Sequence, residues 1–197
     1  MLVDKLTQVS VILGSQSPRR KDLLRAMDIA FEVEVFPTDE LIDPHLSPSE
    51  IAKQIARNKM VPFEGQNYQD KLVITADTVV VSPEGDILGK PQSAEEAVAV
   101  IQSLCGQEHQ VITGVAIRYG GQFLSFAEQT KVQFGVLEDE EIQYYVENYQ
   151  PMDKAGSYGI QEWIGRIGID RIEGSYENVM GLPTQRLYLV LKELFKQ

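Results

Sequence analysis

The sequence predicts an α/β protein with a mixed, twisted sheet flanked by helices. Short apolar runs rich in β-branched residues, such as residues 72–81, alternate along the chain with amphipathic segments of helical length. Two long strand patterns, residues 110–119 and 122–134, are separated only by Gly120-Gly121, a two-residue hairpin signal. A hairpin pairs its strands antiparallel, so we expect a mixed sheet rather than a purely parallel one.

The first elements are expected to be a strand, a loop, a helix and a second strand. Residues 9–13 form a short apolar run that ends at Gly14, which is typical of a buried strand. Ser17 is a suitable N-cap and Pro18 a suitable first residue for a helix that reaches about Met27. Residues 31–36 alternate apolar and acidic side chains, as a half-buried strand does.

The middle of the chain is expected to contain a helix and the central strand. After the polar stretch of residues 38–48, a helix begins near Ser49. Residues 72–81 are almost continuously apolar, which favours a strand buried on both faces. Pro83-Glu84-Gly85-Asp86 then turns the chain back through Ile87-Leu88.

The remaining elements follow from caps, periodicity and glycines. Ser93 is the expected N-cap of a helix with acidic residues in its first turn. We expect helices over about residues 94–104, 139–149 and 183–195, a glycine-containing loop over 151–161, and a strand over 164–172 interrupted by two glycines. Because the chain shows no repeat, low-complexity tract or linker, we expect one domain spanning residues 1–197.

Composition excludes several classes of function. The 197 residues are 43% hydrophobic and 24% charged, which suits a globular core of considerable size. The formal net charge of -11 argues against nucleic-acid coating, since that needs a broad basic surface. The single cysteine, Cys105, excludes an internal disulfide, and two distant histidines make a His/Cys metal site unexpected. Without a leader pattern or a long apolar run, a cytoplasmic protein with no membrane contact is expected.

The segment Ser15-Gln16-Ser17-Pro18-Arg19-Arg20 predicts an anion site. Arg19 and Arg20 fall in the first helical turn, where the helix dipole and unpaired N–H groups disfavour cations. A phosphate would reverse this effect, because it could accept hydrogen bonds from serine hydroxyls, backbone N–H groups and guanidinium groups together. Arginines that point to solvent or pair with carboxylates are the alternative.

Three further polar positions need an explanation. Asp77 lies inside the apolar run, where a carboxylate costs several kcal/mol unless it is paired or bound to metal. It is therefore the best acid–base or metal-ligand candidate, although a structural aspartate would also fit. Lys90 in Gly89-Lys90-Pro91 suits close approach of a ligand, or is an ordinary exposed lysine. The loop at residues 153–161 ends in the polar Gln161. Neither a P-loop nor a G-x-G-x-x-G motif is present.

Taken together, five blocks resemble the Maf family over about residues 9–194. They are Ser15-Gln16-Ser17-Pro18-Arg19-Arg20, Ala76-Asp77-Thr78-Val79-Val80, Gly89-Lys90-Pro91, Asp153-Lys154-Ala155-Gly156-Ser157-Tyr158-Gly159-Ile160-Gln161 and Gly174-Ser175-Tyr176-Glu177-Asn178-Val179-Met180-Gly181-Leu182-Pro183. The resemblance implies an elongated, two-lobed single domain with a central cleft, similar to inosine triphosphatases. It also implies a nucleoside triphosphate pyrophosphatase with a historical link to septum formation.

The resemblance assigns roles to individual residues. Ser15, Arg19, Arg20, Lys59 and Lys90 are expected at the triphosphate, and Lys90 also in catalysis. Glu32 and Asp77 match the family's acidic catalytic positions and would hold Mg²⁺ or Mn²⁺. The implied reaction is attack of water on the α-phosphorus, which yields a nucleoside monophosphate and pyrophosphate.

Arg20, Thr78 and Gln161 match the subgroup that acts on dTTP and UTP. The Gln161 amide offers an acceptor and donors that can meet the N3–H and a carbonyl of uracil or thymine, although a flipped amide could meet cytosine. Gly14 and Gln16 stand at positions where the resemblance implies small residues such as Ala and Gly, which leaves the loop's shape open. The alternatives are a pyrophosphatase for modified purines such as 7-methyl-GTP, and a nucleotide-binding septum regulator without significant catalysis. A homodimer is also left open.

Overall fold

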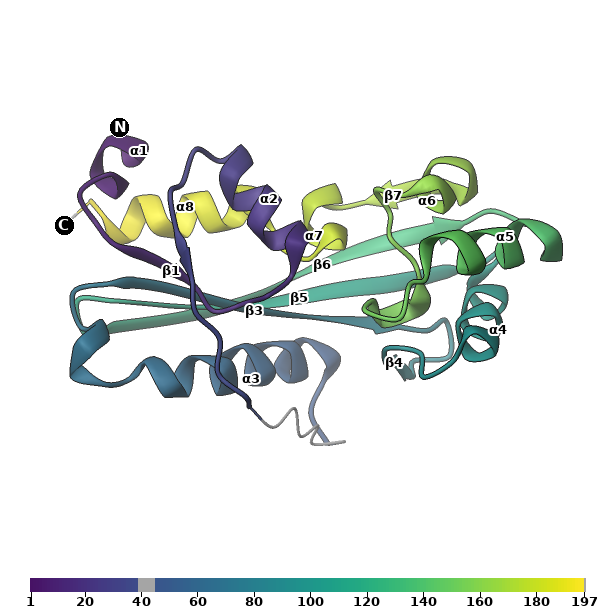
Figure 1. Ribbon diagram of the computed structural model, residues 1–197, viewed down its shortest axis with the longest axis horizontal. Helices are drawn as coiled ribbons and strands as arrows, with labels where there is room; N and C mark the ends of the chain where they lie inside the picture. Colours follow the sequence, from purple (N-terminus) through teal and green to yellow (C-terminus); the bar gives the residue numbers. More distant parts are fainter. Residues whose placement is uncertain (39–44, 197) are drawn as a thin grey trace. The chain divides into compact units, whose positions relative to one another are not determined.

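The computed structural model describes residues 1–38 and 45–196, and its strands form a mixed sheet (Figure 1). Within these residues the strand order is β2-β1-β3-β5-β6-β7, with β4 paired to β3. β1 is parallel to β2 and β3, whereas β4 is antiparallel to β3 and β7 to β6. The predicted fold class, a mixed sheet flanked by helices, is confirmed.

The bounds of the elements agree with the sequence over most of the chain. The strands are β1 Val11–Leu13, β2 Glu32–Val33, β3 Leu72–Val81, β4 Ile87–Leu88, β5 Glu108–Tyr119, β6 Gln122–Phe134 and β7 Ile169–Glu173. The α-helices are α1 Leu2–Leu6, α2 Pro18–Ala26, α3 Pro48–Met60, α4 Ala94–Leu104, α5 Asp139–Tyr149, α6 Trp163–Gly168, α7 Tyr176–Met180 and α8 Thr184–Leu194. Short 3-10 helices are η1 Val61–Phe63, η2 Gln66–Tyr68 and η3 Ala155–Ser157.

Two predicted elements differ from the structure. The strand expected over residues 164–172 was wrong, because Trp163–Gly168 is helical and only Ile169–Glu173 is a strand. Ile164 and Gly168 are both buried, and residues four apart share one face of a helix. The second strand is shorter than the predicted residues 31–36, since only Glu32 and Val33 pair with β1. Residues 39–44 of the predicted polar stretch lie outside the described residues.

The chain divides into two compact units. Unit 1 contains Met1–Asp77, Thr113–Glu128 and Gly181–Gln197, and unit 2 contains Thr78–Ile112 and Gln129–Met180. Strands β3, β5 and β6 each contribute residues to both units. The expectation of a single domain over residues 1–197 stays a prediction.

In unit 1, helices cover both faces of the sheet (Figure 1). α2 and α8 lie over one face and α3 lies over the other. The α3 side of the core contains Ile12, Ala56, Met60, Phe63, Val73 and Ala116. Thr75 is fully buried and its hydroxyl donates to the Ala56 carbonyl at 2.7 Å, which ties β3 to α3. This contact fixes the helix that carries Lys59.

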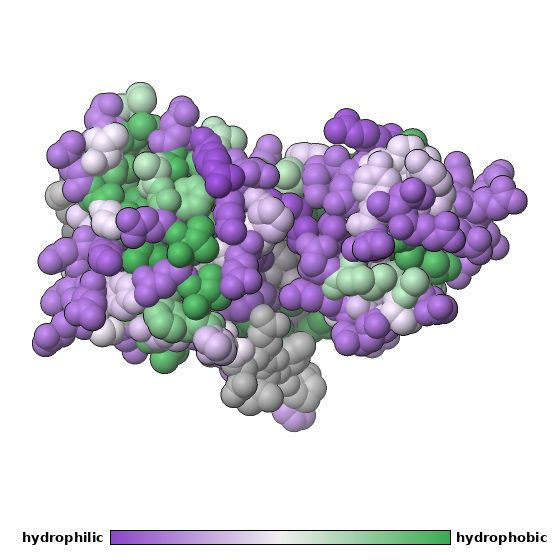
Figure 2. Space-filling model, viewed as in Figure 1, coloured by the Kyte–Doolittle hydropathy of each residue, from purple (hydrophilic) through white to green (hydrophobic). Residues whose placement is uncertain are grey.

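In unit 2, α4 and α5 pack against each other and against the loop between α5 and α6. The core residues are Ala97, Ile101, Leu104, Phe134, Ile142, Tyr145, Val146, Tyr158, Ile160 and Ile164. Tyr158 and Ile160 belong to the loop that ends in Gln161, so this loop packs into the core and is not confined to the surface. On the face shown in Figure 2, hydrophilic residues predominate over unit 2, whereas apolar residues are interspersed over unit 1. Across the described residues, no helix is both long and apolar enough to span a membrane.

Candidate active site

The segment Ser15 to Arg20 forms the predicted helix start. Ser17 is the N-cap of α2, its hydroxyl accepts from the Arg20 N–H at 3.5 Å, and Pro18 is the first helical residue. The first turn of α2 contains no acidic residue. Arg19 and Arg20 therefore lie at the positive end of a helix dipole, as the anion-site prediction requires.

Arg20 has a structural contact that the sequence did not reveal. It is 9% exposed, its Nε donates to the Gly181 carbonyl at 2.8 Å, and its Nη1 donates to Ser15 Oγ at 3.1 Å. Ser15 Oγ also accepts from the Ser17 N–H at 3.3 Å. Arg20 thus orients the Ser15 hydroxyl and joins the start of α2 to the block that ends in Pro183. The sequence pointed to Arg20 only through its place in the first of the five blocks that resemble the Maf family.

Gly14 is required by a close approach. A Cβ at this position would lie 2.6 Å from Thr75 Cγ2 and 3.2 Å from the Phe63 ring, whereas real contacts of this kind are longer than 3.0 Å. The Gly14 N–H also donates to the Ile74 carbonyl at 2.8 Å. The departure from the family pattern at Gly14 therefore fits the packing of β1 against β3.

Lys59 and Asp77 form the ion pair that a buried carboxylate needs. Lys59 Nζ lies 2.6 Å from Asp77 Oδ1, and the side chains are 20% and 15% exposed. Lys59 comes from the last turn of α3 and Asp77 from β3. Because β1 and β3 are parallel, with Leu13 beside Ile74, Asp77 lies three residues further along β3, beyond the end of β1 that Ser15 follows. Unit 1 thus contains both the helix start and the ion pair, each beyond the last residue of β1 in the direction of the parallel strands.

Glu32 is exposed on β2 and is not beside Asp77. It pairs with Ile12, which pairs with Val73, four residues before Asp77 along β3. Strand spacings of about 4.8 Å and a rise of about 3.3 Å per residue place the Glu32 and Asp77 α-carbons roughly 16 Å apart. No group of three or more His, Cys, Asp or Glu side chains suited to a metal occurs in the described part of the chain.

The other three predicted residues, Thr78, Lys90 and Gln161, belong to unit 2. The Gly156 N–H donates to the Gly89 carbonyl at 3.3 Å, so the loop of Gln161 lies beside the turn of Lys90. Gly156 has a φ of 73°, and a Cβ there would lie 3.0 Å from Val80 Cγ1. Val80 is two residues beyond Thr78 on β3. This glycine therefore lets the three segments that carry the predicted residues pack together.

Gln161 carries a buried acceptor with no hydrogen-bond donor among the described residues. Its Oε1 is buried and unpaired, as is the hydroxyl of fully buried Ser157. A buried unsatisfied polar group costs about 1 to 3 kcal/mol, and a ligand donor would relieve that cost. The uracil and thymine rings offer such a donor at N3. The amide can turn about its last torsion, which has a broad energy minimum, to meet it.

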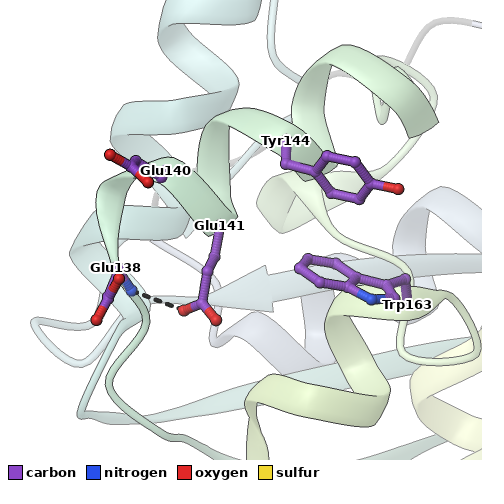
Figure 3. Close-up of a pocket in the computed structure, with 5 residues that line it drawn as sticks. All are labelled: Glu138, Glu140, Glu141, Tyr144 and Trp163. Atoms are coloured by element: carbon purple, nitrogen blue, oxygen red, sulfur yellow. Dashed lines mark hydrogen bonds between the residues drawn. The ribbon is translucent and has the colours of Figure 1, made fainter.

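A separate hollow of unit 2 has a structural explanation (Figure 3). It is lined by Glu138, Glu140, Glu141, Tyr144 and Trp163. The carboxylates lie at the start of α5, where their negative charge is stabilised by the positive end of the helix dipole. Glu141 also accepts a hydrogen bond from the Glu138 N–H at 2.9 Å. The Tyr144 and Trp163 rings meet edge to face with centroids 5.0 Å apart. No predicted site residue lines this hollow.

The comparisons with known proteins give the family. The family model described as Maf-like protein matches residues 10–194. The chain is 48% identical to the dTTP/UTP pyrophosphatase of Porphyromonas gingivalis, with 98% of each chain covered, and 44% identical to that of Flavobacterium psychrophilum, with 97% of each covered. A HAM1 protein structure from Coxiella burnetii has a TM-score of 0.48 at 14% identity, over 96% of this chain and 100% of that one. On the family match and these full-length relatives, the chain belongs to the Maf family.

Proposed function

We propose that this protein is a nucleoside triphosphate pyrophosphatase that hydrolyses dTTP and UTP to the monophosphate and pyrophosphate. The observation that carries the proposal is the similarity, over 98% of both chains, to a relative named dTTP/UTP pyrophosphatase. The ion pair at β3 and the unsatisfied acceptor of Gln161 support it, since each has a task in this reaction. A role in removing nucleotides from cellular pools, with a link to division arrest, is part of the same proposal.

The phosphates would be bound by cations near the start of α2 and at β3. Ser15, Arg19, Arg20 and Lys59 supply donors that suit phosphate oxygens, and Lys90 adds a further cation. Charge on the leaving pyrophosphate grows in the transition state, so fixed cations would stabilise it without transferring a proton. Such local cations are needed because the whole chain carries a net charge of -11.

Asp77 would act on the water that attacks the α-phosphorus. Its carboxylate is held in one orientation by Lys59 at 2.6 Å, which suits a general base or an oxygen ligand. Asp77 and substrate phosphate oxygens fit the preference of Mg²⁺ and Mn²⁺ for oxygen donors, and the bound ion would offset phosphate charge. Glu32 stays a predicted catalytic and metal-binding residue, although it does not pair with Asp77 across the sheet.

Gln161 and Thr78 would read the base. An acceptor at Gln161 Oε1 suits the N3–H of uracil and thymine, whereas N3 of cytosine is itself an acceptor. Because no residue is assigned to the 5-methyl group, dTTP and UTP are expected within roughly two decades of one another in kcat/KM. Purine triphosphates are expected to be poor substrates.

The test is pyrophosphate release by the purified protein over dTTP, UTP, CTP, dATP, GTP and 7-methyl-GTP, with Mg²⁺ or Mn²⁺ added. Asp77→Asn, purified identically, controls for a contaminating hydrolase. Gln161→Ala is expected to erode the preference for dTTP and UTP more than it weakens inhibition by pyrophosphate. Faster hydrolysis of 7-methyl-GTP would overturn the subgroup, and binding of nucleotides without hydrolysis would favour a regulator.

A further inference from the structure

One buried hydroxyl contacts the loop on both sides of Gln161. Tyr145 of α5 is fully buried. Its Oη accepts from the Gly159 N–H at 2.9 Å and donates to Glu162 Oε2. Gly159 and Glu162 are also joined to each other, because the Glu162 N–H donates to the Gly159 carbonyl at 2.9 Å. The three contacts close a ring around Ile160 and Gln161.

Glu162 is held in place by a second buried group. Lys154 Nζ lies 3.2 Å from Glu162 Oε1 and 2.8 Å from Asp153 Oδ1, and the Lys154 side chain is 8% exposed. A buried ion pair is maintained only when its geometry is good and further hydrogen bonds satisfy its atoms, because desolvation costs several kcal/mol per ion. The Tyr145 hydroxyl supplies that further hydrogen bond. Lys154, Glu162 and Tyr145 thus form one connected network, which we call the loop network.

The Tyr145 hydroxyl remains a donor at neutral pH. Burial, followed by its contact with Glu162, raises the pKa of Tyr145 well above its ordinary value. Since Tyr145 has no exposed surface, it cannot touch a nucleotide. Any effect of this residue on the reaction must therefore pass through the loop.

We propose that Tyr145 and Glu162 are positioning residues that hold the backbone of Gln161 at the position from which its amide meets uracil and thymine. This inference rests on the proposed function, and it adds how base selectivity is maintained. The amide itself can turn about its last torsion, so what these contacts fix is its position; on a loop without them, the backbone could shift and let the amide nitrogen reach N3 of cytosine. The loop network stops the backbone on either side of Gln161 from making that shift.

Tyr145→Phe tests the inference, because it removes the hydroxyl and keeps the ring. Tyr144→Phe is the matched control: Tyr144 is on the same helix, is 50% exposed, and its ring meets Trp163 edge to face (Figure 3). The kcat/KM ratio of UTP to CTP is expected to fall about tenfold in Tyr145→Phe, as for the loss of one oriented hydrogen bond. KM for UTP should rise while kcat and inhibition by pyrophosphate change little. Tyr144→Phe should match the wild type.

Glu162→Gln provides a second variant should Tyr145→Phe fail to fold. The glutamine oxygen can still accept from Tyr145, but its charge no longer pairs with Lys154, so an intermediate loss of selectivity is expected. An unchanged UTP-to-CTP ratio in either folded variant would overturn the inference and leave the proposed function standing. A purely structural role would lower the melting temperature without altering that ratio.

Calorimetric binding of UMP and CMP separates the two proposals. If the wild type hydrolyses neither dTTP nor UTP but binds UMP more tightly than CMP, the proposed function fails. The same comparison in Tyr145→Phe then decides the inference, which requires the difference to shrink about tenfold. Equal binding of UMP and CMP by the wild type would refute the inference directly.

Discussion

His109 is predicted to stay neutral in the folded protein down to about pH 4. It lies on β5 in unit 2, is 1% exposed, and its Nε2 is 2.7 Å from the Tyr158 hydroxyl. The Phe134 and Tyr158 rings contact it with centroids 5.9 and 5.5 Å away. Burial lowers the pKa of His109 from 6.5 to about 4, opposed by the charge of Glu108. That opposing charge is already shared with Lys131 and Arg171.

The consequence is a loss of stability in mild acid. In the unfolded chain this histidine takes up a proton near pH 6.5, whereas in the folded protein it does so only near pH 4. The unfolded state therefore binds more protons between these values, and the free energy of unfolding falls as the pH is lowered. At 1.36 kcal/mol per pKa unit, the drop approaches about 3 kcal/mol at pH 4 and is absent above pH 7.

Urea unfolding of the wild type and His109→Gln between pH 7.5 and 4.5 measures this drop. Glutamine remains neutral and can still bond the Tyr158 hydroxyl, so the other titrating groups cancel in the difference between the two proteins. NMR gives a second readout, because the chain has only two histidines and His45→Gln assigns their ring signals. The reasoning would be refuted if the free energies of unfolding of the wild type and His109→Gln changed equally with pH, or if the His109 NMR signal titrated near pH 6.5.

Three further outcomes are expected from substitutions. Asp77→Asn should lower turnover by about 10² to 10⁴ while the fold persists, since asparagine can still accept from Lys59; near-normal rates at saturating metal would remove Asp77 from catalysis. Arg19→Ala and Lys90→Ala should each raise KM and lower kcat in dTTP kinetics, and the double mutant shows whether the losses are non-additive, as for contacts with one triphosphate. Gly114→Ala should lower the free energy of unfolding in urea by about 1 to 3 kcal/mol, because the added Cβ would lie 2.2 Å from the Ala52 carbonyl carbon. Gly65→Ala should leave that free energy unchanged, because nothing lies within 4 Å of a Cβ at this position.

The sequence predicted best those elements whose signals are local. The bounds of β3 agree with its apolar run, those of α4 with the Ser93 cap, and the start of α5 with its acidic first turn. α6 was missed because its helix depends on contacts outside its own residues: Trp163 packs on Tyr144, and a Cβ at Gly165 would lie 2.0 Å from the Ile160 carbonyl oxygen. A two-glycine segment has little helix propensity of its own. Its conformation is set by the fold around it.

The same division applies to the candidate site. The apolar run around Asp77 predicts that its carboxylate needs a partner, but the partner is supplied by the packing of α3 on β3. The contact of Arg20 with Gly181 spans 161 residues of sequence, so no local pattern could reveal it. The role of Tyr145 was equally hidden, because a tyrosine on the apolar face of a helix is an ordinary core residue.

On the proposed assignments, the contacts with the triphosphate and with the base would depend on packing in different units, with Lys90 of unit 2 as the exception. Ser15, Arg20 and Lys59 are held by contacts within unit 1, beyond the end of β1. The loop of Gln161 is held by the core of unit 2, through Tyr145 and the Lys154–Glu162 pair. Packing errors in unit 1 should thus weaken phosphate binding for every nucleotide alike. Errors around the loop should change which base is accepted, so the inhibition constant of pyrophosphate and the UTP-to-CTP ratio report on separate parts of the fold.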